Sequence, residues 1–327
     1  VVHAVLLAPL DYPHGERLVA VETLWTSTVQ ANTDVSGPDF LDWQAQKNVF
    51  ELLAHSNGED EMATTVNGRG SFGNLRSVSA DFFEVFGLPP AAGRLLTGAD
   101  TLRPATGPLA TDTPTLVPAV VGHSWAVTNF GSAEAAVDKT FVLYRNPVRI
   151  VGVAASGFQH PDATNIWIPN GPTNRTNRNA QTYQVVGRLR AGISITGAQA
   201  EMHVVGDRLA AQYPGNRFKN VALIPLQERV TGSVQSTLWM LMAAAGLTLV
   251  IGCANIANLL LARSTIRTRE MALRSALGAG RGRLVRQLLT ESGVLAGAAS
   301  LAGIVLAYVL VQGLVAWSPA NLPRLDG

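Results

Sequence analysis

The sequence predicts an α+β extracytoplasmic domain followed by an α-helical transmembrane pair. Residues 10–230 mix strand-like and helix-like segments, whereas apolar residues are concentrated after Leu238. Two stretches, 238–262 and 293–317, each run for 25 residues without a charged side chain, and seven arginines lie between them. The chain has 327 residues, which is too many for one small core, so several structural units are expected.

The first residues, Val1 to Ala8, are apolar apart from His3. They have neither the basic start nor the long apolar run of a signal peptide. We interpret residues 1–9 as the end of a transmembrane helix, and a buried first strand is the alternative. Residues 10–235 then form the extracytoplasmic domain.

The first part of this domain has clear strand and helix patterns. Residues 18–25 are rich in valine and leucine and predict a strand. Ser36 is a predicted helix N-cap, because Pro38 suits the first turn and Asp39 favours the positive end of the helix dipole. Apolar residues follow at helical spacing, namely Phe40, Trp43, Phe50 and Leu53.

The rest of the domain alternates strands with further helices. Asn67-Gly68 predicts a hairpin turn, and Ser79 is predicted to cap a short helix that carries Phe82, Phe83 and Phe86. Loops are expected at 98–116 and 169–180. Strands are expected at 117–121, in two runs over 140–153 joined at Asn146-Pro147, at 184–189 and at 221–226, and helices at 124–130 and 196–213. This order predicts sheets covered by helices on one face.

Each uncharged stretch is long enough to cross a bilayer. A helix of 25 residues is about 37 Å long, and the hydrocarbon core is about 30 Å thick. Residues 263–292 carry seven arginines and two glutamates, whereas residues 1–237 carry 17 basic and 20 acidic side chains. The positive-inside rule therefore places 263–292 in the cytoplasm, and Trp239 and Trp317 fall at the outer ends of the spans.

Small and amide side chains in the spans predict contacts with other helices. Asn255 and Asn258 lie three residues apart on one helix face, and burying amides in lipid is costly. Gly293 and Gly297 form a G-x-x-x-G pattern that permits close helix approach. Two helices are too few for a transport path, so the expected partners are further permease helices or a second permease half, within the lipid bilayer. No nucleic-acid partner is expected, because the basic cluster does not lie on a folded domain.

Residues 263–292 predict a cytoplasmic connector of two amphipathic helices. One apolar stripe carries Ile266, Leu273 and Leu277, and the other carries Leu284, Val285, Leu288 and Leu289. The glycine-rich run from Gly278 to Gly282 separates them as a hinge. The residues alone leave two interpretations open, a basic surface helix on anionic lipid or a docking element for a cytoplasmic motor.

Two runs in this region carry a family resemblance. They are Cys253-Ala-Asn-Ile-Ala-Asn-Leu-Leu-Leu-Ala-Arg263 and Arg269-Glu-Met-Ala-Leu-Arg-Ser-Ala-Leu-Gly-Ala-Gly-Arg-Gly-Arg-Leu-Val-Arg-Gln-Leu-Leu-Thr-Glu-Ser292. Both resemble the FtsX-like permease domain of MacB-type ABC transporters, and the duplicated permeases of acidobacteria most of all. Upstream, the MacB-like periplasmic core domain is matched by Ala4–Leu10, Asp39–Trp43, Val78–Phe83, Gly87–Arg94 and Arg149–Val153.

The resemblance covers nearly the whole chain and implies a periplasmic core of two α+β lobes, one inserted into the other. It implies a permease subunit in the bacterial inner membrane, whose ATP hydrolysis occurs on a separate cytoplasmic ABC ATPase that binds the connector. Motion of the helices would then reach the periplasmic core, for export or mechanotransmission. The residues in the matching run that are expected to couple the ATPase are Arg269, Glu270, Arg274, Gly278 and Arg281. Family members have a membrane helix before the core and another after residues 318–327, so the chain corresponds to a fragment of the full unit.

The main enzymatic alternative is a membrane-anchored serine hydrolase. Gly122-His-Ser-Trp-Ala126 follows a predicted strand, as the nucleophile motif of α/β-hydrolases does. Ser124 would need an acid, Asp138 or Asp162, and His203 as its base. We favour the interpretation of Ser124 as a helix N-cap, because His203 falls within an amphipathic helix.

No resident cofactor or metal is predicted. Gly278-x-Gly-x-Gly282 lacks the preceding strand and the Lys-Ser/Thr ending of a phosphate loop. The six histidines are scattered without an H-E-x-x-H motif, and the single cysteine, Cys253, allows neither a disulfide within the chain nor a cysteine metal site. A non-functional gene fragment is the third hypothesis for the chain.

Overall fold

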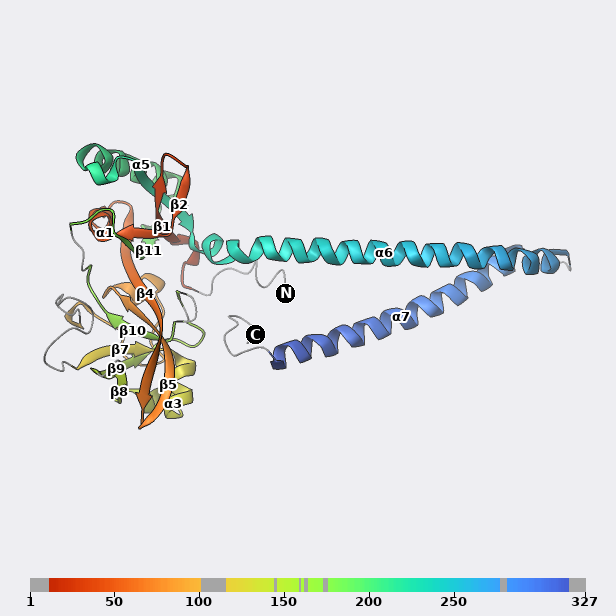
Figure 1. Cartoon of the computed structure of the whole chain (residues 1–327), viewed down its shortest axis with the longest axis horizontal. Coiled ribbons are helices and arrows are strands. Elements are labelled where there is room, and N and C mark those ends of the chain that lie inside the picture. The colour runs from red at the N-terminus through yellow and green to blue at the C-terminus, as the bar shows by residue number, and fades with distance from the viewer. Residues whose placement is uncertain are drawn as a thin grey trace. The chain divides into compact units, whose positions relative to one another are not determined.

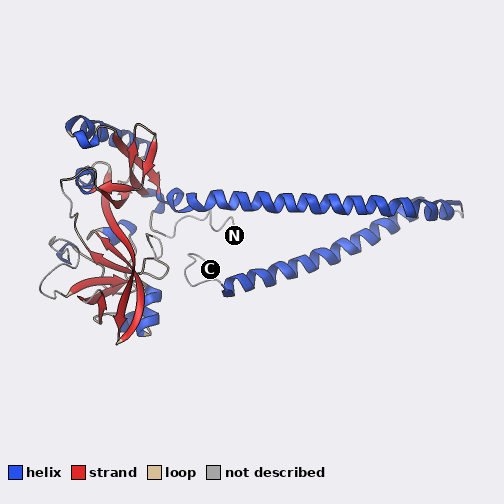
Figure 2. Cartoon of the chain, in the orientation of Figure 1, coloured by secondary structure: helices blue, strands red, loops and turns tan. Residues whose placement is uncertain are grey.

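A computed structural model of the chain describes residues 12–100, 116–143, 146–158, 160–161, 164–172, 176–276 and 281–317. The predictions for residues 1–9 and 318–327 lie outside these ranges. The chain divides into two units, Val1–Ser233 and Val234–Gly327. The first holds all the strands that the structure describes, and the second consists of helix in its described part (Figures 1 and 2).

The α-helices are α1 (Gly37–Gln44), α2 (Phe82–Phe86), α3 (His123–Phe130), α4 (Ala133–Ala136), α5 (Ile195–Gln212), α6 (Leu226–Ala276) and α7 (Arg281–Trp317). Short 3₁₀ turns are η2 (Gly15–Arg17), η3 (Gly98–Asp100) and η4 (Pro214–Asn216). The strands are β1 (Leu18–Trp25), β2 (Gln30–Asn32), β3 (Asp34–Ser36), β4 (Phe50–Val66), β5 (Arg69–Val78), β6 (Ala92–Gly93), β7 (Val117–Val121), β8 (Thr140–Leu143), β9 (Asn146–Val153), β10 (Ile166–Pro169), β11 (Gln181–Leu189) and β12 (Lys219–Pro225).

The first lobe of unit 1 is an antiparallel sheet in the order β12-β1-β11-β4, with β2 paired to β1 and β3 paired to β11. Helices α1 and α5 pack against this sheet (Figure 1). Their apolar faces bury Phe40 and Trp43 from α1 and Met202 and Leu209 from α5 in one core. The expected arrangement of a sheet covered by helices is confirmed for this lobe.

The second lobe is a closed six-stranded barrel. The pairings run β4-β5-β10-β7-β9-β8, and β8 pairs back onto β4. Closure removes the open strand edges that an exposed sheet would present. A single core of aliphatic side chains and aromatic rings fills the barrel, and it includes Leu75, Phe141, Ile150 and Ile166.

Strand β4 belongs to both lobes. Its first half pairs with β11. Its pairing with β5 begins at Ser56, shifts register between Asn57 and Asp60 and continues to Val66, and β8 joins at Thr64 and Thr65. A bulge of this kind bends a strand and lets it change partners. A third core lies under α2, where Phe82, Phe83 and Phe86 pack with residues of both lobes.

Most of the elements expected from the sequence are confirmed. β1 covers the predicted residues, Asn67-Gly68 turns the β4–β5 hairpin with both residues at positive φ, and α5 ends before Pro214. The Ser36 side chain caps α1 by accepting from the Asp39 N–H at 3.2 Å.

Three local predictions are wrong. Helix α1 ends at Gln44, and Phe50 and Leu53 lie in β4, where Leu53 pairs with Gly187 of β11. Their helical spacing is overridden by sheet pairing with a distant segment. Ser79 does not cap α2, because its Oγ accepts from the backbone N–H of His55 at 3.1 Å. The third concerns Ser124 and is described below.

Candidate functional site

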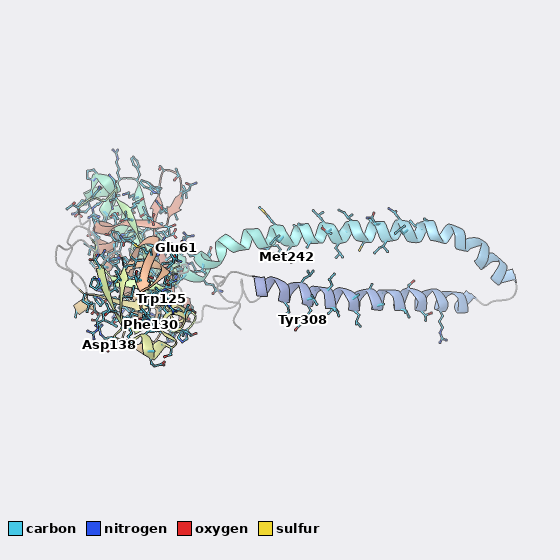
Figure 3. The ribbon with its side chains drawn as sticks, turned by 60° about the horizontal axis from the view of Figure 1, so that its bottom comes forward. Glu61, Trp125, Phe130, Asp138, Met242 and Tyr308 are labelled. Carbon is cyan, nitrogen blue, oxygen red and sulfur yellow. The ribbon has the colours of Figure 1, made fainter. Side chains whose placement is uncertain are left out.

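The first functional feature is the apolar surface of the two long helices. The segments Trp239–Leu259 of α6 and Ser292–Gly313 of α7 are long and apolar enough to cross a bilayer. Their described side chains are exposed, as Met242 and Tyr308 illustrate in Figure 3. Continuous apolar exposure of this length is incompatible with water and is typical of helices in lipid.

The residues predicted to mediate helix packing lie on these segments. Asn255 and Asn258 are exposed on α6, and among the described residues no other part of the chain packs against Gly293 or Gly297 of α7. The described parts of the chain therefore leave all four positions open to other helices. Their role in packing stays a prediction.

The described connector residues fall in the last part of α6 and at the start of α7. Arg269, Glu270 and Arg274 lie in α6, which continues without a break from its apolar span to Ala276. Arg281 is the first residue of α7. Gly278 lies outside the described residues, so its role as a hinge stays a prediction, as does the coupling role of all five.

The second functional feature is the direct passage from the sheet into α6. Strand β12 ends at Pro225 and α6 begins at Leu226 with no residue between them. Leu226 is 2% exposed and packs in the core shared by the two lobes. The root of α6, which we define as residues 226–233, thus belongs to unit 1. The sequence indicated a strand through residue 226 and did not reveal this junction.

The serine hydrolase alternative is not favoured. Ser124 is an exposed residue inside α3, whose N-cap is Gly122, so its predicted N-cap role is also wrong. Asp138 pairs with Arg149 at 2.7 Å, and Asp162 lies outside the described residues. His203 is an exposed residue of α5, which packs on the sheet of the first lobe, whereas α3 contributes Trp125 and Ala126 to the barrel core.

The described residues contain no group of three or more His, Cys, Asp or Glu side chains that could hold a metal ion. They do contain a buried ionic cluster that the sequence did not reveal. Arg178 donates to Asp39 and Asp42, at 2.6 Å each, and Asn216 donates to the same Asp39 oxygen as Arg178. Burial lowers the pKa of Lys219, whose ammonium donates to the Arg178 carbonyl oxygen at 2.5 Å. Arg178 and Asn216 are more than 130 positions from their aspartate partners, and Lys219 is 41 positions from Arg178, so no local pattern marks the cluster.

This cluster is structural in character. It ties α1 to the segment before β11 and to η4, and the Arg178 guanidinium also stacks on the Tyr213 ring at 3.7 Å. Burial alone would lower the pKa of Arg178, but the hydrogen bonds to Asp42 and Asp39 raise it. The guanidinium therefore stays charged, and its ion pairs connect the elements of the first lobe.

A two-lobed α/β domain that continues without a linker into long, exposed apolar helices defines a membrane protein with a large extramembrane part. Residues 7–205 match the MacB-like periplasmic core domain, and residues 242–323 match the FtsX-like permease C-terminal domain. The chain belongs to this family of ABC-transporter permeases, which lie in the bacterial inner membrane with a periplasmic domain.

Curated relatives agree with this assignment. The chain is 27% identical over 184 residues to the macrolide export ATP-binding/permease protein MacB of Shewanella sp. (strain ANA-3), which covers 55% of this chain and 28% of that protein. It is 24% identical over 262 residues to a probable export ATP-binding/permease protein MacB of Pseudomonas entomophila (strain L48), covering 76% and 37%. The chain thus spans less than two fifths of either relative.

A solved structure shares the fold of the extramembrane part. It is a domain assigned to a permease protein from Porphyromonas gingivalis, and it matches with a TM-score of 0.50 and 16% identity. The match covers 66% of this chain and 93% of that domain.

Proposed function

We propose that the chain is the permease subunit of a MacB-type export or mechanotransmission system, driven by a separate cytoplasmic ABC ATPase. One observation carries the proposal, namely the unbroken helix α6. It begins in the core of the periplasmic unit at Leu226, contains an apolar span and ends at Ala276 in the arginine-rich connector.

An unbroken helix of 51 residues is about 76 Å long and is stiff along its axis. A force applied to the connector is then delivered along the helix to the strand that precedes it. The arginines of residues 263–292 favour a cytoplasmic position for the connector, where an ATPase acts. This arrangement transmits motion without requiring a channel through the two helices.

The 327 residues contain no phosphate-binding motif, so the proposal places ATP hydrolysis on an ABC ATPase outside them. The curated relatives are named ATP-binding/permease proteins, so ATP binding accompanies the permease in them, and this chain matches only a part of each. The helix surfaces around Asn255 and Gly293 are proposed to contact further permease helices or a second permease half. Arg269, Glu270, Arg274, Gly278 and Arg281 are proposed to contact or position the ATPase.

Reconstitution tests the proposal. The chain is purified with its copurifying ABC ATPase and inserted into lipid nanodiscs, and ATP hydrolysis is measured with and without the chain. We expect the chain to stimulate hydrolysis. The double variant Arg274→Gln/Arg281→Gln is expected to reduce this stimulation at least about tenfold, the effect of losing about 1.4 kcal/mol of coupling.

The double variant Arg274→Lys/Arg281→Lys is the matched control, because it keeps the charge that sets the membrane orientation but lacks the planar donors of arginine. If both double variants insert correctly and the glutamine variant still stimulates hydrolysis fully, these residues do not couple the ATPase. If the wild-type chain binds no ATPase, the proposed function is rejected.

A further inference from the structure

The root of α6 carries an ion pair with a buried carboxylate that the family assignment does not use. The Arg229 Nε lies 2.7 Å from Oε1 of Glu22 in β1, although its N–H is not aligned for a hydrogen bond to that oxygen. The Glu22 side chain is only 5% exposed, whereas that of Arg229 is 41% exposed. The Arg229 Nη2 also donates to Oγ1 of Thr33 at 2.7 Å.

These partners belong to the most connected part of the first lobe. Strand β1 pairs with β12 along one edge, where Glu22 lies opposite Ala222. Along its other edge β1 pairs with β11 up to Val21 and with β2 from Thr23, so Glu22 is held by pairing on one side and by paired neighbours on the other. Thr33 lies between β2 and β3. The first turn of α6 is therefore attached to β1 and to the β2–β3 segment as well as to its own strand.

Arg229 and Leu226 act on the same helix face, because residues three apart are neighbours on a helix. Leu226 provides apolar contact, which is not directional and permits the helix to rotate about its own axis. The hydrogen bond to Thr33 has a defined geometry, and the ion pair holds the Arg229 guanidinium next to Glu22, so both contacts oppose that rotation. Leu226 thus anchors the root of α6 in the core, and the two polar contacts of Arg229 fix its orientation.

The charge balance around Glu22 favours a cation at position 229. Glu22 is buried, and the nearby Asp34 carboxylate adds a second negative charge. Burial, joined by Asp34, raises the pKa of Glu22 above its ordinary value, and the positive charge of Arg229 opposes that rise. Removing one partner of such a pair leaves a buried charge uncompensated.

We propose that Arg229 is a positioning residue that clamps the root of α6 to β1 through Glu22 and to the β2–β3 segment through Thr33. Movement of α6 then displaces the first lobe as a body instead of being lost by rotation or fraying at the helix start. This transmission role rests on the proposed function, whereas the clamp itself does not.

Hydrogen–deuterium exchange of the full chain in lipid nanodiscs tests the clamp. The informative amides are those of residues 230–233, because they are the first in α6 that bond within the helix. Arg229→Gln is expected to speed their exchange about tenfold. Glu22→Gln/Arg229→Gln is expected to do the same while leaving no buried charge, so that the melting temperature stays near that of the wild type.

Arg149→Gln is the matched control, because it breaks the exposed pair with Asp138 in the barrel. It should leave the exchange of residues 230–233 unchanged. Wild-type exchange rates in both Arg229 variants would overturn the clamp.

The transmission role is tested with the double variant in the reconstituted ATPase assay. The double variant is expected to bind the ATPase normally and to lose at least half of the stimulation. Full stimulation together with faster exchange would overturn the transmission role and leave the proposed function intact. Failure of the wild-type chain to stimulate hydrolysis would instead reject the proposed function, and the exchange measurement would still decide the clamp.

Discussion

At the residue scale, His55 shows how strongly the first lobe excludes water. Its side chain is fully buried in β4, with its ring 4.8 Å from Phe40 and 4.9 Å from Tyr183, both in edge-on contact. Neither ring nitrogen has a hydrogen-bond partner among the residues that the structure describes. Burial therefore disfavours the imidazolium and lowers the pKa of His55 to about 3.

This lowered pKa predicts acid sensitivity. Below the ordinary histidine pKa of about 6.5 the unfolded chain binds a proton, while folded His55 stays neutral until about pH 3. The stability of the fold is thus unaffected by His55 above pH 6.5. It decreases as the pH falls from 6.5 toward 3. We expect the free energy of unfolding of His55→Leu to depend less steeply on pH between pH 6 and pH 4, by about 1.4 kcal/mol per pH unit. Urea unfolding followed by tryptophan fluorescence measures it, and identical slopes would contradict it.

Three serines show what local sequence can predict about single residues. Ser36, Ser79 and Ser124 each precede or begin a helix, and each was expected to cap it. Ser36 does so. The Ser79 Oγ instead accepts a hydrogen bond from the backbone N–H of His55 in β4, and Gly122 is the N-cap of the helix that contains Ser124. Local pattern identifies residues suited to a cap, and tertiary contacts decide which of them serve.

At the element scale, the long helices and the paired strands differ in how much the sequence reveals. The length of each uncharged apolar stretch and the arginines between them indicated both membrane helices, because these signals lie within the segments themselves and need no distant partner. The closed barrel was not predicted, since its closure depends on β8 pairing with both β4 and β9, and β10 was not recognised. The root of α6 was missed for a similar reason, because Glu22 and Arg229 are separated by the whole domain.

The native Cys253 permits a direct test of the α6 span. It lies within Trp239–Leu259, where a thiol surrounded by lipid is inaccessible to water-soluble reagents. We expect a membrane-impermeant maleimide to leave Cys253 unlabelled in intact cells and to label it after denaturation in SDS. In a Cys253→Ser background, Val230→Cys should be labelled from the periplasmic side, and Arg286→Cys only in inside-out vesicles. Labelling of Cys253 at the rate found for Val230→Cys would contradict the span.

At the scale of the whole molecule, apolar surface is divided unevenly between the two units. All residues of the three cores of unit 1 lie within positions 12–226. Long runs of exposed apolar side chains are found on α6 and α7. The periplasmic unit should therefore be stable without the membrane, provided that its own contacts are kept. Those contacts extend past the last strand, because Leu226 is in a core and Arg229 pairs with Glu22.

Two fragments separate these contributions. Residues 10–233 retain the root of α6 and are expected to be soluble and to melt in one cooperative transition. Residues 10–225 keep every strand but lack Leu226 and Arg229, so they lose a buried leucine and leave Glu22 as an unpaired buried carboxylate. We expect the shorter fragment to be less stable by about 3 kcal/mol, which lowers the melting temperature by about 6–12 °C for a domain of this size. Circular dichroism and size-exclusion chromatography measure both, and equal melting temperatures would show that the first turn of α6 is not part of the periplasmic fold.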